Sequence, residues 1–182
     1  RDNAKNDPLA SSRDYYDRFR NRIMFPINDI GGRVIGFSAR VMPDGDDKMG
    51  KYINTPETLV YNKSRVVYGL DKAKLAVRKN GFCILVEGQL DVIMSHQVDV
   101  KNTAAVSGTA LTTEHLAIIK RYTKNLALCF DSDQAGGNAT KRAIDLAIAS
   151  GLTTKIIVPG ESKDPADIIK QDLKLWIKAI SQ

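Results

Sequence analysis

The segments Cys83-Ile84-Leu85-Val86-Glu87-Gly88 and Leu126-Ala127-Leu128-Cys129-Phe130-Asp131-Ser132-Asp133 decide the fold. In each, a short apolar run ends directly at acidic residues. A third run, Ile156-Ile157-Val158, precedes Asp164 and Asp167. Apolar runs of this length, separated by helical patterns, are typical of buried parallel strands. Ligands of such sheets bind outside the carboxyl ends of the strands. We therefore expect the acidic side chains to meet in one crevice.

Carboxylates gathered at one sheet edge favour a bound cation. They repel one another and raise one another's pKa unless positive charge neutralises them. Asp131 and Asp133 occupy alternate positions of an extended segment, so both can face one hard divalent ion such as Mg2+. Asp91 follows Glu87 by one helical turn. Two alternatives remain, a solvent-exposed corner at Glu87 and a helix cap at Asp133.

The order of predicted elements indicates an α/β fold. An N-terminal hairpin (23–27 and 33–37) carries Pro26, which predicts an edge strand or a bulge. After it, strands and helices alternate, which predicts right-handed crossovers and a parallel sheet covered on both faces. At the first strand-to-helix corner, Gly88 predicts a sharp backbone turn. The expected strands are 83–86, 103–106, 126–130 and 155–158, and the expected helices are 71–79, 89–97, 112–122, 135–149 and one opened by Asp164-Pro165.

The distribution of charge is more informative than the net charge of +6 over 182 residues. Residues 1–82 contain 16 Lys/Arg and 10 Asp/Glu, whereas residues 83–182 contain 11 of each. A basic surface beside a metal site fits a polyanion, although a merely solubilising surface is an equal alternative on charge alone. No apolar run approaches the roughly 20 residues of a membrane span, so no membrane partner is expected. Cys83 and Cys129 lie in predicted strands, which favours core positions in a reducing compartment.

The acidic motifs resemble the Toprim domain in content and order. Glu87–Val92, Asp131–Gly136 and Lys163–Pro165 carry this resemblance. The N-terminal half resembles the segment that leads into the Toprim domain of DnaG-type primases, and the similarity covers about residues 14–172. Its matching pieces are Tyr16–Ile27, Gly32–Phe37 with Arg40, Lys51–Thr58, Lys63 and Tyr68–Leu70.

The resemblance implies a fold and a domain scheme. The fold would be a Toprim domain, Rossmann-like with a mainly parallel sheet and helices on both faces, preceded by part of a smaller α+β N-terminal subdomain. Residues 1–81 would form the basic subdomain fragment and residues 82–170 the metal-binding catalytic domain. Residues 171–182 would begin a C-terminal helical region.

The resemblance also implies an activity, namely de novo synthesis of short RNA primers on single-stranded DNA by two- or three-metal nucleotidyl transfer. Glu87, Asp131 and Asp133 would be catalytic. Mg2+, for which Mn2+ can substitute, would be held by Glu87, Asp91, Asp131, Asp133, Asp164 and Asp167. Glu87 would act as a ligand or as a general acid or base, and Asp91 as a ligand or as a support for Glu87. Nucleotide and template would contact Arg40, Lys51, Asn54 and Lys63.

The implied partners are a single-stranded DNA template, ribonucleoside triphosphates and the RNA–DNA hybrid product, in the bacterial cytoplasm at the replication fork. A helicase-binding C-terminal domain and a zinc-binding N-terminal domain are expected outside this chain. The sequence departs from the family at Gln89, usually Tyr, at Ser38-Ala39, usually Gly-Gly, and at Ala166, often Asp. Two alternatives stay open: another Toprim enzyme, such as a nuclease or topoisomerase, and a non-catalytic nucleic-acid-binding module.

Overall fold

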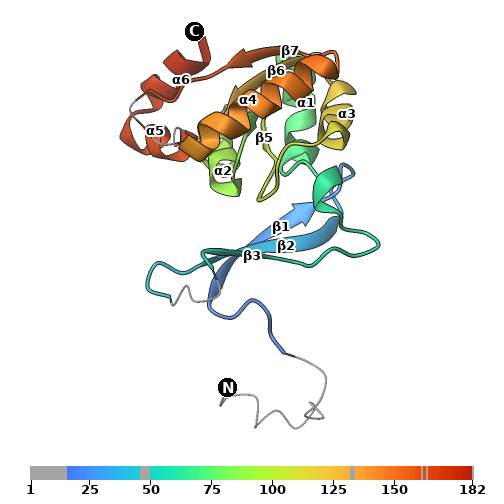
Figure 1. Ribbon diagram of the computed structural model, residues 1–182. Helices are drawn as coiled ribbons and strands as arrows, with labels where there is room; N and C mark the ends of the chain where they lie inside the picture. Colours follow the sequence, from blue (N-terminus) through green and yellow to red (C-terminus); the bar gives the residue numbers. More distant parts are fainter. Residues whose placement is uncertain (1–15, 46–49, 132–133, 161, 163, 182) are drawn as a thin grey trace. The chain divides into compact units, whose positions relative to one another are not determined.

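The computed structural model describes residues 16–45, 50–131, 134–160, 162 and 164–181 (Figure 1). The chain divides into two compact units. The first contains Arg1–Pro26 and Phe37–Thr55, and the second contains Ile27–Gly36 and Pro56–Gln182. Among the described residues, no helix has both the length and the apolar character needed to cross a membrane.

The N-terminal hairpin is present as predicted and is extended by a third strand. Its strands are β1 (Arg22–Asn28), β2 (Val34–Val41) and β3 (Tyr52–Asn54), in the sheet order β1-β2-β3. Pro26 lies on β1, an edge strand, where a missing amide hydrogen costs no ladder bond. Strands β2 and β3 are antiparallel, with Arg40 opposite Tyr52 and Ser38 opposite Asn54.

The second unit contains the predicted alternation of strands and helices. Its four-stranded sheet has the order β5-β4-β6-β7, and each neighbouring pair is parallel. Strands β4, β6 and β7, which precede the acidic motifs, are therefore adjacent. The elements are the 3-10 turn η2 (Lys63–Arg65), α1 (Leu70–Asn80), β4 (Cys83–Val86), α2 (Gln89–Gln97), β5 (Thr103–Ala105), α3 (Thr113–Lys120), β6 (Asn125–Cys129), α4 (Gln134–Ala149), β7 (Thr153–Ile156), α5 (Pro165–Gln171) and α6 (Leu173–Ser181).

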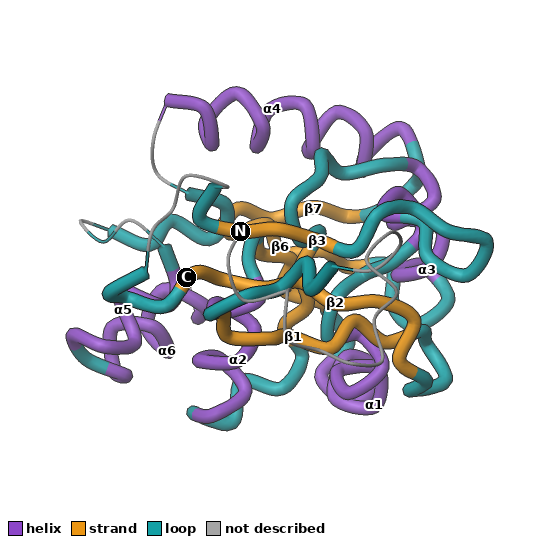
Figure 2. Tube along the Cα trace, turned by 90° about the horizontal axis from the view of Figure 1, so that it is seen from below, coloured by secondary structure: helices purple, strands orange, loops and turns teal. Residues whose placement is uncertain are grey.

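Each face of the parallel sheet has its own hydrophobic core. Along β4 the side chains alternate: Cys83 and Leu85 pack with residues of α1, α3 and α4. Ile84 and Val86 pack on the opposite face with residues of α2, α5 and α6, including the fully buried Trp176. Figure 2 shows α4 on one side of β6 and β7 and α5 and α6 on the other. Each fully buried aliphatic side chain contributes about 1.5–3 kcal/mol relative to an exposed one.

Both cysteines have the predicted core positions. Cys83 and Cys129 are buried free thiols, and burial raises the pKa of each to about 12. Both side chains therefore behave as small apolar groups.

One expectation was wrong in detail. The run Ile156-Ile157-Val158 is not a buried strand: β7 ends at Ile156, and Ile156 and Val158 are 54% and 67% exposed. The reason is that β7 is an edge strand whose pairing with β6 begins earlier, at Thr153. Gly88 lies at the predicted strand-to-helix corner with extended backbone angles, φ −115° and ψ 162°. A Cβ there would lie 3.1 Å from Asp91 Oδ2, so glycine provides space for that carboxylate.

Candidate metal and nucleotide site

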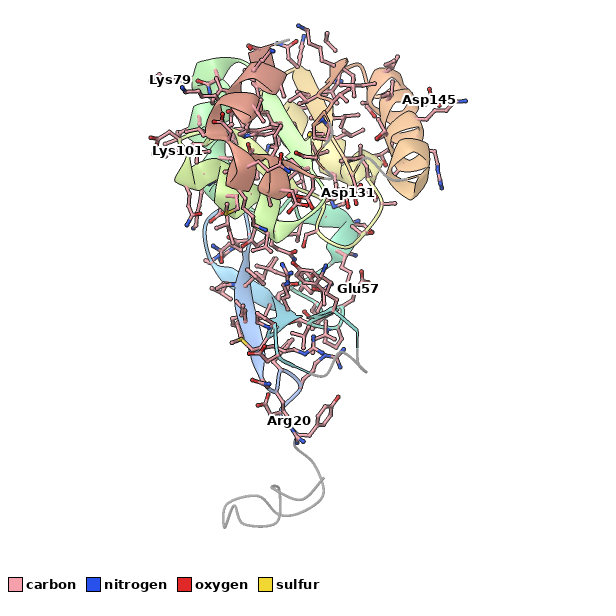
Figure 3. The ribbon with its side chains drawn as sticks, turned by 90° about the vertical axis from the view of Figure 1, so that its left-hand side faces the viewer. Arg20, Glu57, Lys79, Lys101, Asp131 and Asp145 are labelled. Atoms are coloured by element: carbon pink, nitrogen blue, oxygen red, sulfur yellow. The ribbon has the colours of Figure 1, made fainter. Side chains whose placement is uncertain are left out.

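One hydrogen bond joins the residues that follow β4 and β6. Glu87 directly follows β4 and Asp131 lies two residues past the end of β6. The Asp131 main-chain N–H donates to Glu87 Oε1 at 3.1 Å. Both residues are partly exposed, so two acidic residues lie at an accessible edge of the sheet. Figure 3 shows Asp131 at this edge, while Asp145 projects from the outer side of α4.

Asp91 connects the Glu87–Gly88 corner to the start of α5. Its carboxylate is buried, and Oδ2 accepts the Gly88 N–H at 3.1 Å. Oδ1 accepts the N–H of Ala166, 75 residues later in the chain, also at 3.1 Å. Burial raises the pKa of Asp91 to about 7, and the nearby charges of Asp164 and Asp131 act in the same direction. These contacts fit the supporting role that the sequence left open beside direct metal ligation.

Asp164 begins α5 as its N-cap. Its side chain accepts the Asp167 N–H at 2.8 Å, and Pro165 occupies the first helical turn as predicted. The Asp167 carboxylate instead faces Lys170, with Oδ1 3.5 Å from the Lys170 ammonium. The charge of Asp164 raises the pKa of Asp91, whereas Asp167 has a cation partner on its own helix. The metal role of Asp167 stays a prediction.

A divalent metal fits the chemistry of this acidic edge. Carboxylate oxygens are hard donors suited to Mg2+ or Mn2+, and the raised pKa of Asp91 reflects in part the accumulated negative charge of Asp164 and Asp131. Among the described residues, no three His, Cys, Asp or Glu side chains are arranged to hold an ion without adjustment. Asp133, one of the predicted ligands, lies outside the described residues.

Three of the four predicted nucleotide contacts belong to the first unit. Arg40 and Tyr52 are opposite one another on β2 and β3, with the guanidinium 5.8 Å from the ring centroid. Asn54 is two residues past Tyr52 and therefore shares its face of the sheet. Within the described part of the chain, the buried Asn54 Oδ1 has no hydrogen-bond partner. Lys51 is exposed immediately before β3.

Lys63, the fourth predicted contact, lies in the second unit on the η2 turn. The Asn62 side chain caps this turn by accepting the Ser64 N–H at 2.9 Å. Two residues at the start of α3 hold its backbone: Thr112 Oγ1 donates to Ser64 O at 2.8 Å, and His115 Nε2 contacts Lys63 O at 2.8 Å. A contact across 52 residues has no local sequence signal.

Two family models match the chain. The N-terminal domain of the DNA primase catalytic core matches residues 4–74, and a Toprim-like domain matches residues 84–169.

Similar proteins carry both parts in the same order. The chain is 39% identical over 169 residues to a DNA primase of Staphylococcus epidermidis, covering 92% of this chain and 28% of that protein. It superposes on the zinc-binding and RNA polymerase domains of Aquifex aeolicus primase with a TM-score of 0.87 and 35% identity, covering 94% of this chain and 42% of that one. It also superposes on a DnaG primase catalytic domain bound to single-stranded DNA, with a TM-score of 0.82 and 33% identity. This match covers 92% of this chain and 53% of that one.

Proposed function

Because the chain belongs to the family of bacterial DnaG-type primases, we propose that it forms the nucleotidyl-transfer centre of a DNA-directed RNA polymerase that makes primers de novo. The chain spans little more than a quarter of the Staphylococcus epidermidis relative, so the activity of a whole primase is part of this proposal. The division into residues 1–81, 82–170 and 171–182 is proposed with it.

The contact between Glu87 and the Asp131 amide carries the proposal. It joins the residues that follow two neighbouring strands, through 3.1 Å between the Asp131 amide nitrogen and Glu87 Oε1, at the edge where open α/β sheets bind their ligands. Asp164 reaches the same neighbourhood, since its charge raises the pKa of Asp91. Phosphoryl transfer requires positioning and electrostatic stabilisation more than covalent chemistry, and an acidic edge of this kind supplies metal ligands for both.

Glu87, Asp131, Asp133 and Asp164 would hold the divalent metal, which would neutralise charge on a triphosphate and activate the attacking hydroxyl. Asp91 would hold the Glu87–Gly88 corner beside the start of α5, which Asp164 caps, because it accepts one backbone hydrogen bond from each. The Asp131 amide would restrain the Glu87 carboxylate through Oε1.

The basic residues would bind the polyanionic substrates. Lysines act as point charges on phosphates, which suits Lys51 and Lys63, whereas Arg40 presents a planar fork that can bind two oxygens at once. Asn54 offers a buried amide oxygen on the same sheet face as Tyr52. The relative bound to single-stranded DNA supports a DNA template as the partner. Ribonucleoside triphosphates, the RNA–DNA hybrid, a replicative helicase and a cytoplasmic location at the replication fork complete the proposal.

Manganese binding and primer synthesis test this function together. Electron paramagnetic resonance would count bound Mn2+ in the chain, and ribonucleotide incorporation on single-stranded DNA would be measured in the full-length enzyme. We expect Asp131→Asn to remove both signals, while Asp145→Asn, an exposed aspartate on α4, leaves them unchanged. Metal binding without ribonucleotide incorporation would instead favour a nuclease or topoisomerase-like Toprim enzyme. Absence of metal binding would overturn the proposal.

A further inference from the structure

A cavity of about 620 Å3 lies beside Glu87 in the second unit, on the side of the sheet covered by α4. The loop between β5 and α3 forms one wall, and Phe130 at the end of β6 forms another. The third wall is a helical stripe on α4 that includes Ala139, Arg142 and Leu146. This volume is typical of small-molecule sites, and the cavity opens to solvent.

The lining is mainly apolar with charge at two places. Leu111, Phe130 and Leu146 provide apolar surface, Glu87 lies at one boundary, and Arg142 contributes a guanidinium. A flat heteroaromatic ring fits these walls, because its faces gain apolar contact while its edge keeps access to polar groups and water. A purely aliphatic ligand would make no use of the charged boundary.

The loop that forms this cavity is attached to the corner that carries Glu87. Ser107 adopts a left-handed conformation (φ 53°), and Gly108 follows with φ 75°. A left-handed serine persists only where its surroundings hold it. Here the Ser107 N–H donates to Glu87 O at 3.0 Å, and the buried Gln89 side-chain amide donates to Ser107 Oγ. These hydrogen bonds therefore fix the position of the cavity-forming loop relative to Glu87.

We propose that this cavity binds the base of a nucleotide whose phosphates lie at the edge formed by Glu87 and Asp131. The inference rests on the proposed function, because it takes the phosphate position from it. A base is joined to its phosphate through a single sugar, so a nucleotide held at this edge must place its base nearby, and this cavity includes Glu87 in its wall. Apolar walls discriminate weakly among bases. That property suits a template-directed enzyme, which must accept four of them.

A comparison of two ligands isolates the contribution of the base. Dissociation constants for ATP and for inorganic tripolyphosphate would be measured by calorimetry with Mn2+ present. Ala139→Phe fills the cavity without replacing an acidic residue, and Ala149→Phe makes the same change at an exposed position of α4 as a control. We expect Ala139→Phe to weaken ATP binding about tenfold, in line with base stacking, and to leave tripolyphosphate binding unchanged. Ala149→Phe should alter neither.

Two results would overturn the inference while leaving the proposed function intact: equal affinities of the wild type for ATP and tripolyphosphate, or unaltered ATP binding by Ala139→Phe. Wild-type protein that binds neither ligand with Mn2+ would count against the proposed function itself.

Methyl NMR of the wild type decides the matter even if Ala139→Phe fails to fold. ATP should shift the methyl signals of Leu111 and Leu146 through its ring current, while the fully buried Leu116 serves as the control. An oligothymidylate compared with its abasic counterpart distinguishes a DNA base from the base of a free nucleotide. Unshifted Leu111 and Leu146 signals with every one of these ligands would overturn the inference.

Discussion

The imidazole of His115 holds the main-chain carbonyl of Lys63, with Nε2 2.8 Å from the oxygen. The other ring nitrogen, Nδ1, accepts the Thr112 N–H at 3.3 Å, so the proton belongs on Nε2. Burial lowers the pKa of His115, which keeps the ring neutral in this arrangement. A fully buried histidine on α3 thus fixes the backbone that carries a proposed phosphate-binding lysine.

Replacing His115 should therefore affect both folding and ligand binding. His115→Leu leaves the Lys63 carbonyl and the Thr112 amide without their partner, and we expect a loss of about 1–3 kcal/mol in the free energy of unfolding. ATP binding with Mn2+ should weaken as well. Lys63→Ala should weaken ATP binding with little change in stability. Urea unfolding and calorimetry measure the two quantities, and unimpaired ATP binding by folded His115→Leu would disprove a positioning role.

Asp91 gives a prediction for the pH dependence of stability. Its folded pKa of about 7 lies above the ordinary value of 3.8 for an aspartate, so the folded state binds more protons between these values. Stability contributed by neutral Asp91 is present at low pH and is lost as the pH rises toward and past 7. Relative to Asp91→Asn, the wild type should lose on the order of 3 kcal/mol between pH 4 and 8. Urea unfolding across this range measures the difference, and contributions of His96 and His115 cancel because both proteins contain them.

A constant difference in unfolding free energy between the two proteins across that range would show that Asp91 ionises normally. Asp145→Asn is the control: its carboxylate is exposed on α4, and its stability profile should follow that of the wild type.

The sequence predicted those features that local patterns encode. Strand β4 and helix α2 have the bounds that the apolar run 83–86 and the pattern 89–97 indicate. The contact between Asp91 and the Ala166 amide spans 75 residues and depends on how α2 and α5 pack, for which no local pattern exists. The exposure of Val158 likewise follows from the edge position of β7, which is a property of the assembled sheet.

Asp131→Asn should separate metal binding from folding. The hydrogen bond to Glu87 uses the Asp131 main-chain amide, so the substitution preserves it while removing the carboxylate. We expect loss of Mn2+ binding and of primer synthesis, with unfolding free energy unchanged or slightly increased because like-charge repulsion decreases. Glu87→Ala, by contrast, removes the acceptor and should reduce stability by about 1 kcal/mol. A marked destabilisation of Asp131→Asn in urea would refute this separation.

Lys51→Ala should weaken nucleotide and DNA binding most at low ionic strength. Lys51 is exposed, and a lysine that contacts phosphate acts mainly through charge that salt screens. Log affinity falls as log salt rises, and removing one phosphate contact should make this slope less steep by about 1. Fluorescence anisotropy with labelled single-stranded DNA at several salt concentrations measures this slope. Lys101→Ala, at another exposed lysine, is the control, and an unaltered slope in Lys51→Ala would rule out the phosphate contact.

Gln89 provides the sharpest test of the loop that borders the cavity. Its side-chain amide donates to Ser107 Oγ, and both groups are buried, so Gln89→Leu leaves the hydroxyl without its donor. We expect a loss of about 1–3 kcal/mol in unfolding free energy, and faster amide hydrogen exchange at Ser107 and Gly108, because the left-handed serine loses one of its two restraints. Gln97→Leu makes the same change at an exposed position of α2 and should alter neither quantity. Unchanged exchange at Ser107 in Gln89→Leu would mean that the N–H bond to Glu87 holds this loop alone.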